Sequence, residues 1–123
     1  MDLMLKDKVV FITGPAKGMG AAITLAFANE GAKLALVGRD TAAIEPVAEE
    51  ARSKGCSVVV IGCDLTDAGQ CDAAALKTVE AFGRIDVLVN VAGGSGPMGK
   101  TGVETTPEEF DDIVTLNMNG CFH

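Results

Sequence analysis

Residues 9–20 read Val-Val-Phe-Ile-Thr-Gly-Pro-Ala-Lys-Gly-Met-Gly, and this stretch decides the fold class. Its first part, 9–12, is a short apolar run rich in β-branched residues, which is typical of a buried strand. The turn from Gly14 to Gly20 has the spacing G-x-x-x-G-x-G, and apolar residues at helical spacing follow it up to Gly31. A buried strand, a glycine turn and a helix predict the opening unit of a parallel α/β sheet.

The glycine turn is suited to a bound pyrophosphate. Gly14 permits a tight reversal, Gly18 lets the backbone approach a phosphate, and Gly20 lets the helix pack closely on the strand. The free N–H groups at the helix N-terminus, in the Lys17–Met19 segment, would then face the phosphates. The same glycine pattern also fits an ordinary strand–helix turn, but its place after a buried strand favours a dinucleotide site.

The rest of the chain repeats the alternation of strand and helix. We expect further strands at 34–37, 57–61 and 85–89, and helices at 41–54, from 67 to 82, and from 106 to the end. Alternation of this kind predicts helices on both faces of a parallel sheet, joined by right-handed crossovers. The predicted fold is a Rossmann-type doubly wound α/β domain over 1–123, with strand order 3-2-1-4 in the part present and the other half missing.

Local signals mark the ends and faces of the helices. Pro46 predicts a first turn or a kink in the second helix. Asp67 and Gln70 have the spacing of a capping box, as do Thr106 and Glu109. In the helix from 67 to 82, the expected buried stripe consists of Leu76, Val79 and Phe82.

Composition excludes several classes of protein. Hydrophobic residues make up 48% of the 123 residues and aromatic residues 4%, so Val, Ile, Leu and Ala must build the core. A net charge of −7 disfavours nucleic-acid binding. The sequence shows no apolar run long enough for a membrane span and no secretion signal, so we expect a cytoplasmic protein. The four cysteines form no C-x-x-C pair and His123 is the only histidine, so we expect reduced thiols and no metal site.

Three segments of the expected cofactor site resemble the short-chain dehydrogenase/reductase family. Residues 13–20 match its T-G-x-x-x-G-x-G motif. Asp64 and Leu65 match the position where an aspartate recognises the adenine amino group. Residues 90–93 match the N-N-A-G motif, with Val91 in place of the second asparagine. The resemblance therefore implies cofactor contacts from Asn90, Ala92 and Gly93 as well.

A fourth segment, 116–120, resembles the family's helix that carries a catalytic asparagine, and Asn117 aligns with it. Structural interpretations stay open for single residues: Asp64 could cap a turn, Asn90 could satisfy backbone groups, and Asn117 could be a helix-surface amide. Four motifs in order and at the right separations favour the functional interpretation.

The cofactor preference depends on the end of the second strand. An acidic residue there selects NAD, and an arginine accommodates the 2′-phosphate of NADP. Gly38 occupies the usual acidic position, Arg39 follows it, and Lys17 adds a second positive charge. We therefore expect NADP(H) to be favoured over NAD(H). Asp40 leaves an alternative open, because it could neutralise Arg39 or act as the acidic selector.

The family's catalytic tyrosine and lysine lie in a Y-x-x-x-K motif beyond the segment of Asn117, and this sequence contains no tyrosine. We therefore expect the chain to be the N-terminal part of a longer enzyme and 1–123 alone to be inactive. Such a piece would leave the fourth strand with an open hydrophobic edge, which is an aggregation hazard.

The leading functional hypothesis is an NADP(H)-dependent oxidoreductase that transfers hydride between nicotinamide and an alcohol or carbonyl carbon. The resemblance implies a small-molecule substrate, and we expect a homo-oligomer (dimer or tetramer) for the whole protein. The loop 94–102 would border the active site, where Met98 could touch substrate or pack against the loop. Alternatives are a non-catalytic nucleotide-binding or regulatory protein and, with a poorer fit to the motifs, an S-adenosylmethionine-dependent methyltransferase.

Overall fold

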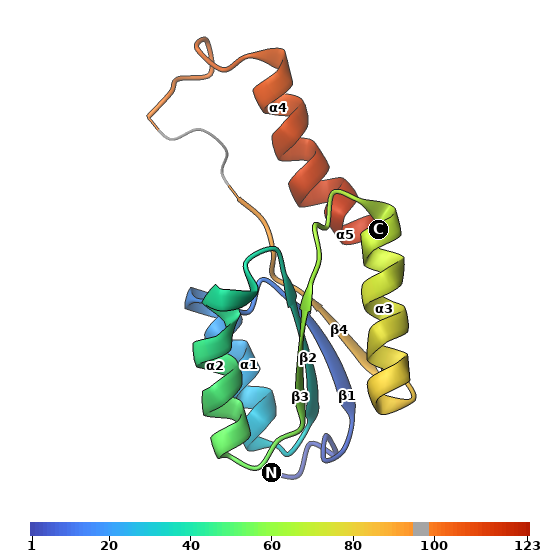
Figure 1. The fold of residues 1–123 in the computed structure, drawn as a ribbon. Helices are drawn as coiled ribbons and strands as arrows, with labels where there is room; N and C mark the ends of the chain where they lie inside the picture. Colours follow the sequence, from blue (N-terminus) through green and yellow to red (C-terminus); the bar gives the residue numbers. More distant parts are fainter. Residues whose placement is uncertain (95–98) are drawn as a thin grey trace.

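The structure is a computed structural model that describes residues 1–94 and 99–123. Its centre is a parallel four-stranded sheet (Figure 1). The strands are β1 (Val9–Thr13), β2 (Lys33–Gly38), β3 (Val58–Gly62) and β4 (Val87–Asn90). Their order, β3-β2-β1-β4, confirms the predicted Rossmann-type topology.

The register of the sheet brings all the strand ends to one edge. Thr13 lies opposite Val37 of β2 and Asn90 of β4, and Gly38 lies opposite Gly62 of β3. Because the strands are parallel, the turns that follow them meet at this carboxyl edge. Ligands of open α/β sheets bind at such an edge, so the topology points to it as the place for a site.

Helices cover both faces of the sheet (Figure 1). Helices α1 (Gly18–Asn29) and α2 (Thr41–Ser53) lie on one face, and α3 (Ala68–Phe82) lies on the other. A continuous helical segment stands beyond the carboxyl edge and ends beside the start of α3. It consists of α4 (Pro107–Val114), a π-helical turn η1 (Thr115–Asn119) and α5 (Gly120–Phe122).

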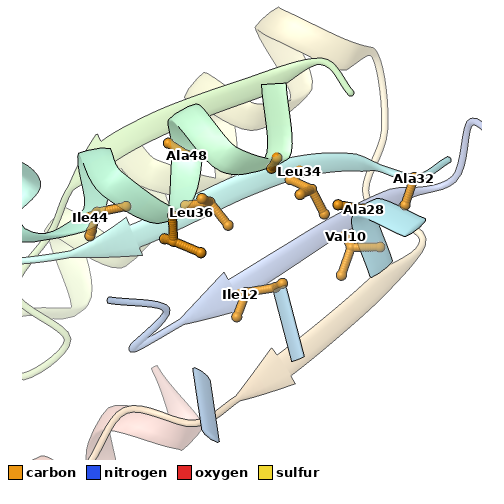
Figure 2. Close-up of a cluster of buried hydrophobic side chains, with 10 residues drawn as sticks. Val10, Ile12, Ala28, Ala32, Leu34, Leu36, Ile44 and Ala48 are labelled. Atoms are coloured by element: carbon orange, nitrogen blue, oxygen red, sulfur yellow. The ribbon is translucent and has the colours of Figure 1, made fainter. Parts of the chain in front are cut away.

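Alternate residues of the strands build two apolar layers. Between the sheet and helices α1 and α2 lies the larger one, shown in Figure 2, which includes Val10, Ile12, Leu34 and Leu36. The opposite face of the same strands contributes to the smaller layer under α3, which contains Phe11, Ala35, Val37, Ile61, Cys63 and Ala74. Aliphatic side chains and alanines dominate both layers, as the composition requires. Both faces of the sheet are thus packed against apolar side chains, which fixes the position of its carboxyl edge.

The predicted stripe of α3 was wrong for Leu76 and Val79, whereas Phe82 is half-buried. Leu76 is 59% exposed and Val79 is 42% exposed, whereas Ala74 and Thr78 are buried against the sheet. Small side chains let the helix backbone approach the strands closely, so the helix turns its small-residue face inward. The bulky residues then lie on a face that no element of the described chain covers.

The last helix is not the single α-helix that the periodicity predicts. It widens at η1, where the N–H of Gly120 donates to the carbonyl of Thr115, five residues earlier. The side-chain Nδ2 of Asn117 donates to the carbonyl of Ile113 at 2.9 Å. That carbonyl is the one an α-helical N–H of residue 117 would use, so the side chain competes with the backbone there.

The capping signals were partly right. Thr106 and Glu109 form the predicted reciprocal capping box at the start of α4. Asp67 caps α3 by accepting from the N–H of Gln70, but the Gln70 side chain does not return to the Asp67 N–H. Pro46 lies inside α2, on its exposed side, rather than in its first turn. No helix in the described ranges is both long and apolar enough to cross a membrane.

Candidate functional site

Gly14 begins the turn at the carboxyl end of β1. Its φ of +67° lies in the left-handed region, and a Cβ there would stand 2.8 Å from the Cα of Ala92. Backbone conformation and close packing therefore both require glycine at this position. The two motif segments, 13–20 and 90–93, touch at this contact.

Thr13 adds a second link between these segments, and the motif reading gave its side chain no role. Its buried Oγ1 accepts hydrogen bonds from the N–H groups of Val91 and Ala92, each at 3.2 Å. The same hydroxyl donates to the carbonyl of Val89 at 3.5 Å. A hydroxyl residue at the end of an otherwise apolar strand was the signal in the sequence. Thr13 thus fixes the path of the chain where β4 ends.

The N-terminus of α1 is open. Its N-cap residue, Lys17, is extended and supplies no side-chain hydrogen bond to the helix. Gly18 has φ +58°, and a Cβ there would meet nothing within 4 Å. Lys17, Gly18 and Met19 are all exposed, whereas Gly20 is buried, and a Cβ on it would collide with the carbonyl of Gly14. The start of the helix is thus exposed at Gly18 and Met19 and has no side-chain cap, as an anion-binding turn requires.

Beside this helix start lies a cavity of about 170 Å³ at the carboxyl edge. Its walls bring together residues from separate segments of the sequence that were predicted to bind the cofactor. The lining includes Gly14, Arg39, Asp64, Leu65, Ala92 and Gly93, together with Gly38, Cys63 and Leu116. An open helix N-terminus next to a cavity with a carboxylate and a guanidinium on its wall fits a dinucleotide.

The carboxylate of Asp64 is held by its neighbour Thr66. Its Oδ1 accepts from the Thr66 N–H at 3.0 Å and from the Thr66 hydroxyl at 2.7 Å. These hydrogen bonds, the hydroxyl first, lower the pKa of Asp64 below its ordinary value, and the charge of Arg39 adds to the effect. The group is an ionised acceptor at neutral pH. The predicted turn-capping role and a place on the cavity wall therefore occur together.

Arg39 and Asp40 differ in what they do. Asp40 is the N-cap of α2, and its Oδ1 accepts from the Ala43 N–H at 3.1 Å. Arg39 is exposed on the cavity wall and forms no ion pair with any residue that the structure describes. Asp40 therefore does not neutralise Arg39 through a direct ion pair.

Asn90 and Asn117 lie outside the cavity of Asp64. Asn90 borders a second cavity of about 160 Å³ between β4, α3 and the C-terminal residues, together with Phe11, Leu65 and Leu88. The Asn117 side chain is engaged with the backbone: Oδ1 accepts from the Gly94 N–H at 3.1 Å, and Nδ2 donates to the Gly94 carbonyl at 2.8 Å. Asn117 thus holds Gly94, which follows the end of β4. Met98 lies outside the described residues.

Three of the four cysteines line these cavities: Cys63 the cavity of Asp64, and Cys71 and Cys121 the second one. Cys63 and Cys71 have their sulfur atoms 4.0 Å apart, and burial raises the pKa of Cys63 to about 12. Among residues 1–94 and 99–123, no group of three or more His, Cys, Asp or Glu side chains is placed to hold a metal ion. Cys63 is therefore a protonated, packed thiol.

The sequence model of the short chain dehydrogenase family matches residues 8–123, which is nearly the whole chain. The chain belongs to the short-chain dehydrogenase/reductase family. This membership confirms the resemblance drawn from the motifs, and it excludes the methyltransferase alternative. The sheet order and the open turn after β1 are those of a Rossmann-type cofactor domain.

Similar proteins of this family are oxidoreductases. D-threitol dehydrogenase of Mycolicibacterium smegmatis is 35% identical over 98% of this chain and 46% of its own length. A 3-ketoacyl-(acyl-carrier-protein) reductase from Brucella melitensis, solved with NADH, is 35% identical with a TM-score of 0.84, over 96% of this chain and 47% of that one. An actinorhodin polyketide ketoreductase solved with NADPH is 29% identical with a TM-score of 0.87, over 94% of this chain and 44% of that one. The chain therefore spans less than half the length of these relatives, and both cofactors occur among them.

Proposed function

We propose that residues 1–123 are the cofactor-binding part of an NADP(H)-dependent short-chain dehydrogenase/reductase. The whole protein would transfer hydride between nicotinamide and the alcohol or carbonyl carbon of a small molecule. The observation that carries the proposal is the open N-terminus of α1 beside a cavity that gathers Gly14, Arg39 and Asp64. The bound nicotinamide supplies the hydride donor or acceptor, and the residues of this chain hold it.

Each segment of the carboxyl edge has a part in this proposal. The N–H groups of Gly18, Met19 and Gly20 would take the pyrophosphate at the dipole end of α1. Asp64 and Leu65 would bind the adenine, Arg39 and Lys17 the ribose phosphate, and the 90–93 segment the side of the cofactor nearer β4. Thr13 holds that segment in place through its two accepted hydrogen bonds.

The preference for NADP(H) follows from the charges around β2. The carboxylate of Asp40 is occupied as the cap of α2, and Gly38 leaves no acidic group at the strand end. Arg39 is an exposed cation on the cavity wall, and Lys17 is an exposed cation in the turn after β1. Positive charge here favours a 2′-phosphate over a 2′-hydroxyl. We expect the whole protein to bind NADPH more tightly than NADH.

Titration of the full-length protein with each reduced cofactor, followed by nucleotide fluorescence, tests this preference. Arg39→Ala should weaken NADPH binding about tenfold, which corresponds to about 1.4 kcal/mol for one charge-assisted pair, and leave NADH binding nearly unchanged. Lys77→Ala, on the exposed side of α3, is the matched removal of a positive charge away from the site. Tighter binding of NADH that Arg39→Ala leaves intact would contradict the preference.

Asn117 is proposed as the family's catalytic asparagine. It would also position the backbone of Gly94. Its amide clamps Gly94 at both the N–H and the carbonyl, so it would fix the chain at Gly94 beside the expected nicotinamide site. The sequence has no tyrosine for the family's acid/base role. Turnover would therefore need residues outside 1–123, and we expect 1–123 alone to oxidise no NADPH. A cytoplasmic homo-oligomer is the proposed form of the whole protein.

A further inference from the structure

We propose that Gln70 and Thr66 are positioning residues that make Asp64 select an adenine base, with its 6-amino group, over a 6-oxo purine. This inference rests on the proposed function and concerns the turn between β3 and α3. Thr66 holds the Asp64 carboxylate, and Gln70 holds the Asp64 backbone. Neither residue lines the cavity itself, so both would act through Asp64.

Thr66 determines which carboxylate oxygen remains for a ligand. Both hydrogen bonds from Thr66 converge on Oδ1 of Asp64, through the N–H at 3.0 Å and the hydroxyl at 2.7 Å. Rotation of the carboxylate would break both, so Oδ2 is left as the acceptor for a base. The same bonds keep the group ionised, and an ionised carboxylate only accepts hydrogen bonds.

Gln70 reaches back from the first turn of α3 to hold the strand end. Its Oε1 accepts from the Asp64 N–H at 2.8 Å, and its Nε2 donates to Oδ2 of Asp67 at 3.3 Å. The Asp67 N–H donates to the Asp64 carbonyl at 3.0 Å, which closes the turn from the other side. The side chain of Gln70 therefore spans the turn and ties the backbone of Asp64 to the helix.

The chemistry of the base explains why this rigidity would matter. The 6-amino group of adenine is a donor, whereas the 6-oxo group of hypoxanthine is an acceptor that a carboxylate repels. A site built to accept from a donor rejects a ligand that lacks it, provided that the acceptor cannot turn away. With Oδ1 occupied and the Asp64 N–H bonded to Gln70, Oδ2 is the carboxylate oxygen left to accept from the base.

The substitution Gln70→Met isolates this role. It removes the side-chain bonds to Asp64 and Asp67 but keeps the length of the side chain. The helix cap is preserved, because Asp67 is bonded at 3.2 Å by the backbone N–H of Gln70. Dissociation constants for NADPH and for nicotinamide hypoxanthine dinucleotide phosphate are measured in the full-length protein. We expect the wild type to favour the adenine form, and Gln70→Met to reduce that ratio about tenfold.

Two further variants separate positioning from general stability. Asp64→Ala should abolish the adenine preference, and adding Gln70→Met to it should change the ratio no further, since Gln70 acts through Asp64. Thr66→Val, which keeps the residue's shape, should reduce the ratio independently and covers the case in which Gln70→Met does not fold. Lys77→Met, on an exposed part of α3, should leave the ratio unchanged.

The outcomes distinguish this inference from the proposed function. An adenine preference that survives both Gln70→Met and Thr66→Val in folded protein would overturn the positioning role alone. An equal loss from Gln70→Met with and without Asp64 would also overturn it. Absence of binding to either dinucleotide in the wild type would overturn the proposed function and this inference together.

Discussion

At the scale of single residues, Gly14 carries two requirements at once. Its φ of +67° is unfavourable for any L side chain, and a Cβ would stand 2.8 Å from Ala92 backbone atoms. Because Ala92 is held in turn by the Thr13 hydroxyl, it cannot easily move aside. The positions of β1, β4 and the turns after them therefore depend on this one contact.

Gly14→Ala should lower the free energy of unfolding by about 3 kcal/mol, from the left-handed backbone and the clash together. Gly55→Ala is the matched control: its φ is +89°, but a Cβ there meets nothing within 4 Å. Only the conformational cost remains at Gly55, about 1 kcal/mol. Urea unfolding of both variants measures the difference. Equal losses at the two glycines would show that the approach to Ala92 costs nothing.

The hydrogen bonds of Asp64 predict how the stability of the protein depends on pH. The pKa of Asp64 is lowered in the folded protein, chiefly by the Thr66 hydroxyl and N–H. The stability from these bonds is therefore fully present above the ordinary carboxyl pKa and is lost as pH falls through the lowered value. Thr66→Val should raise the pKa of Asp64 toward its ordinary value, as followed by NMR titration of the carboxyl carbon. A pKa that Thr66→Val leaves unchanged would contradict the assignment of the shift.

Sequence patterns predict the positions of residues, such as glycines, whose type the backbone conformation requires. They do not predict side-chain hydrogen bonds, because these depend on which groups the fold brings close together. The glycine spacing placed Gly14 at the end of β1 and Gly20 at the base of α1, and the structure has both there. The Gln70 spacing correctly predicted its backbone part in the cap of α3. It did not predict that the side chain would bond Asp64, because that choice depends on how β3 ends against the helix.

At the scale of elements, the segment from α4 to α5 is the clearest departure from periodicity. A single widened turn shifts the 3.6-residue period only once, over too few residues for the apolar pattern to reveal it, so the pattern did not predict η1. We attribute η1 to the amide of Asn117, which bonds the carbonyl of Ile113 and both backbone polar groups of Gly94. Helix α3 shows a similar limit, because small residues rather than Leu76 face the sheet.

Asn117→Ala should relax η1 toward an ordinary α-helix and release Gly94. We expect faster amide exchange at Gly94 and a loss of about 1 kcal/mol in the free energy of unfolding, since its bonds are largely exposed. Asn119→Ala, in the same turn, is the control because it leaves the Asn117 amide in place. Unchanged exchange at Gly94 in Asn117→Ala would contradict the clamping role. Exchange is measured by mass spectrometry on peptides that cover 90–94.

At the scale of the whole molecule, the sheet has an edge strand on each side, β3 on one and β4 on the other. β4 pairs only with β1 in the described chain, and Leu88 on it is 57% exposed. Leu88 lines the second cavity together with Ile85, and Leu76 and Val79 are exposed on α3. The relatives are more than twice as long as the matched span.

The measurement that tests the central claim most directly is hydrogen–deuterium exchange of the full-length protein with and without saturating NADP⁺. Binding at the carboxyl edge should slow exchange in peptides that cover 14–21, 38–41 and 62–67. Peptides that cover 80–86, at the opposite edge of the sheet, should exchange at the same rate in both states. Protection that spares the N-terminus of α1, or that appears only at the opposite edge, would contradict the proposed cofactor site.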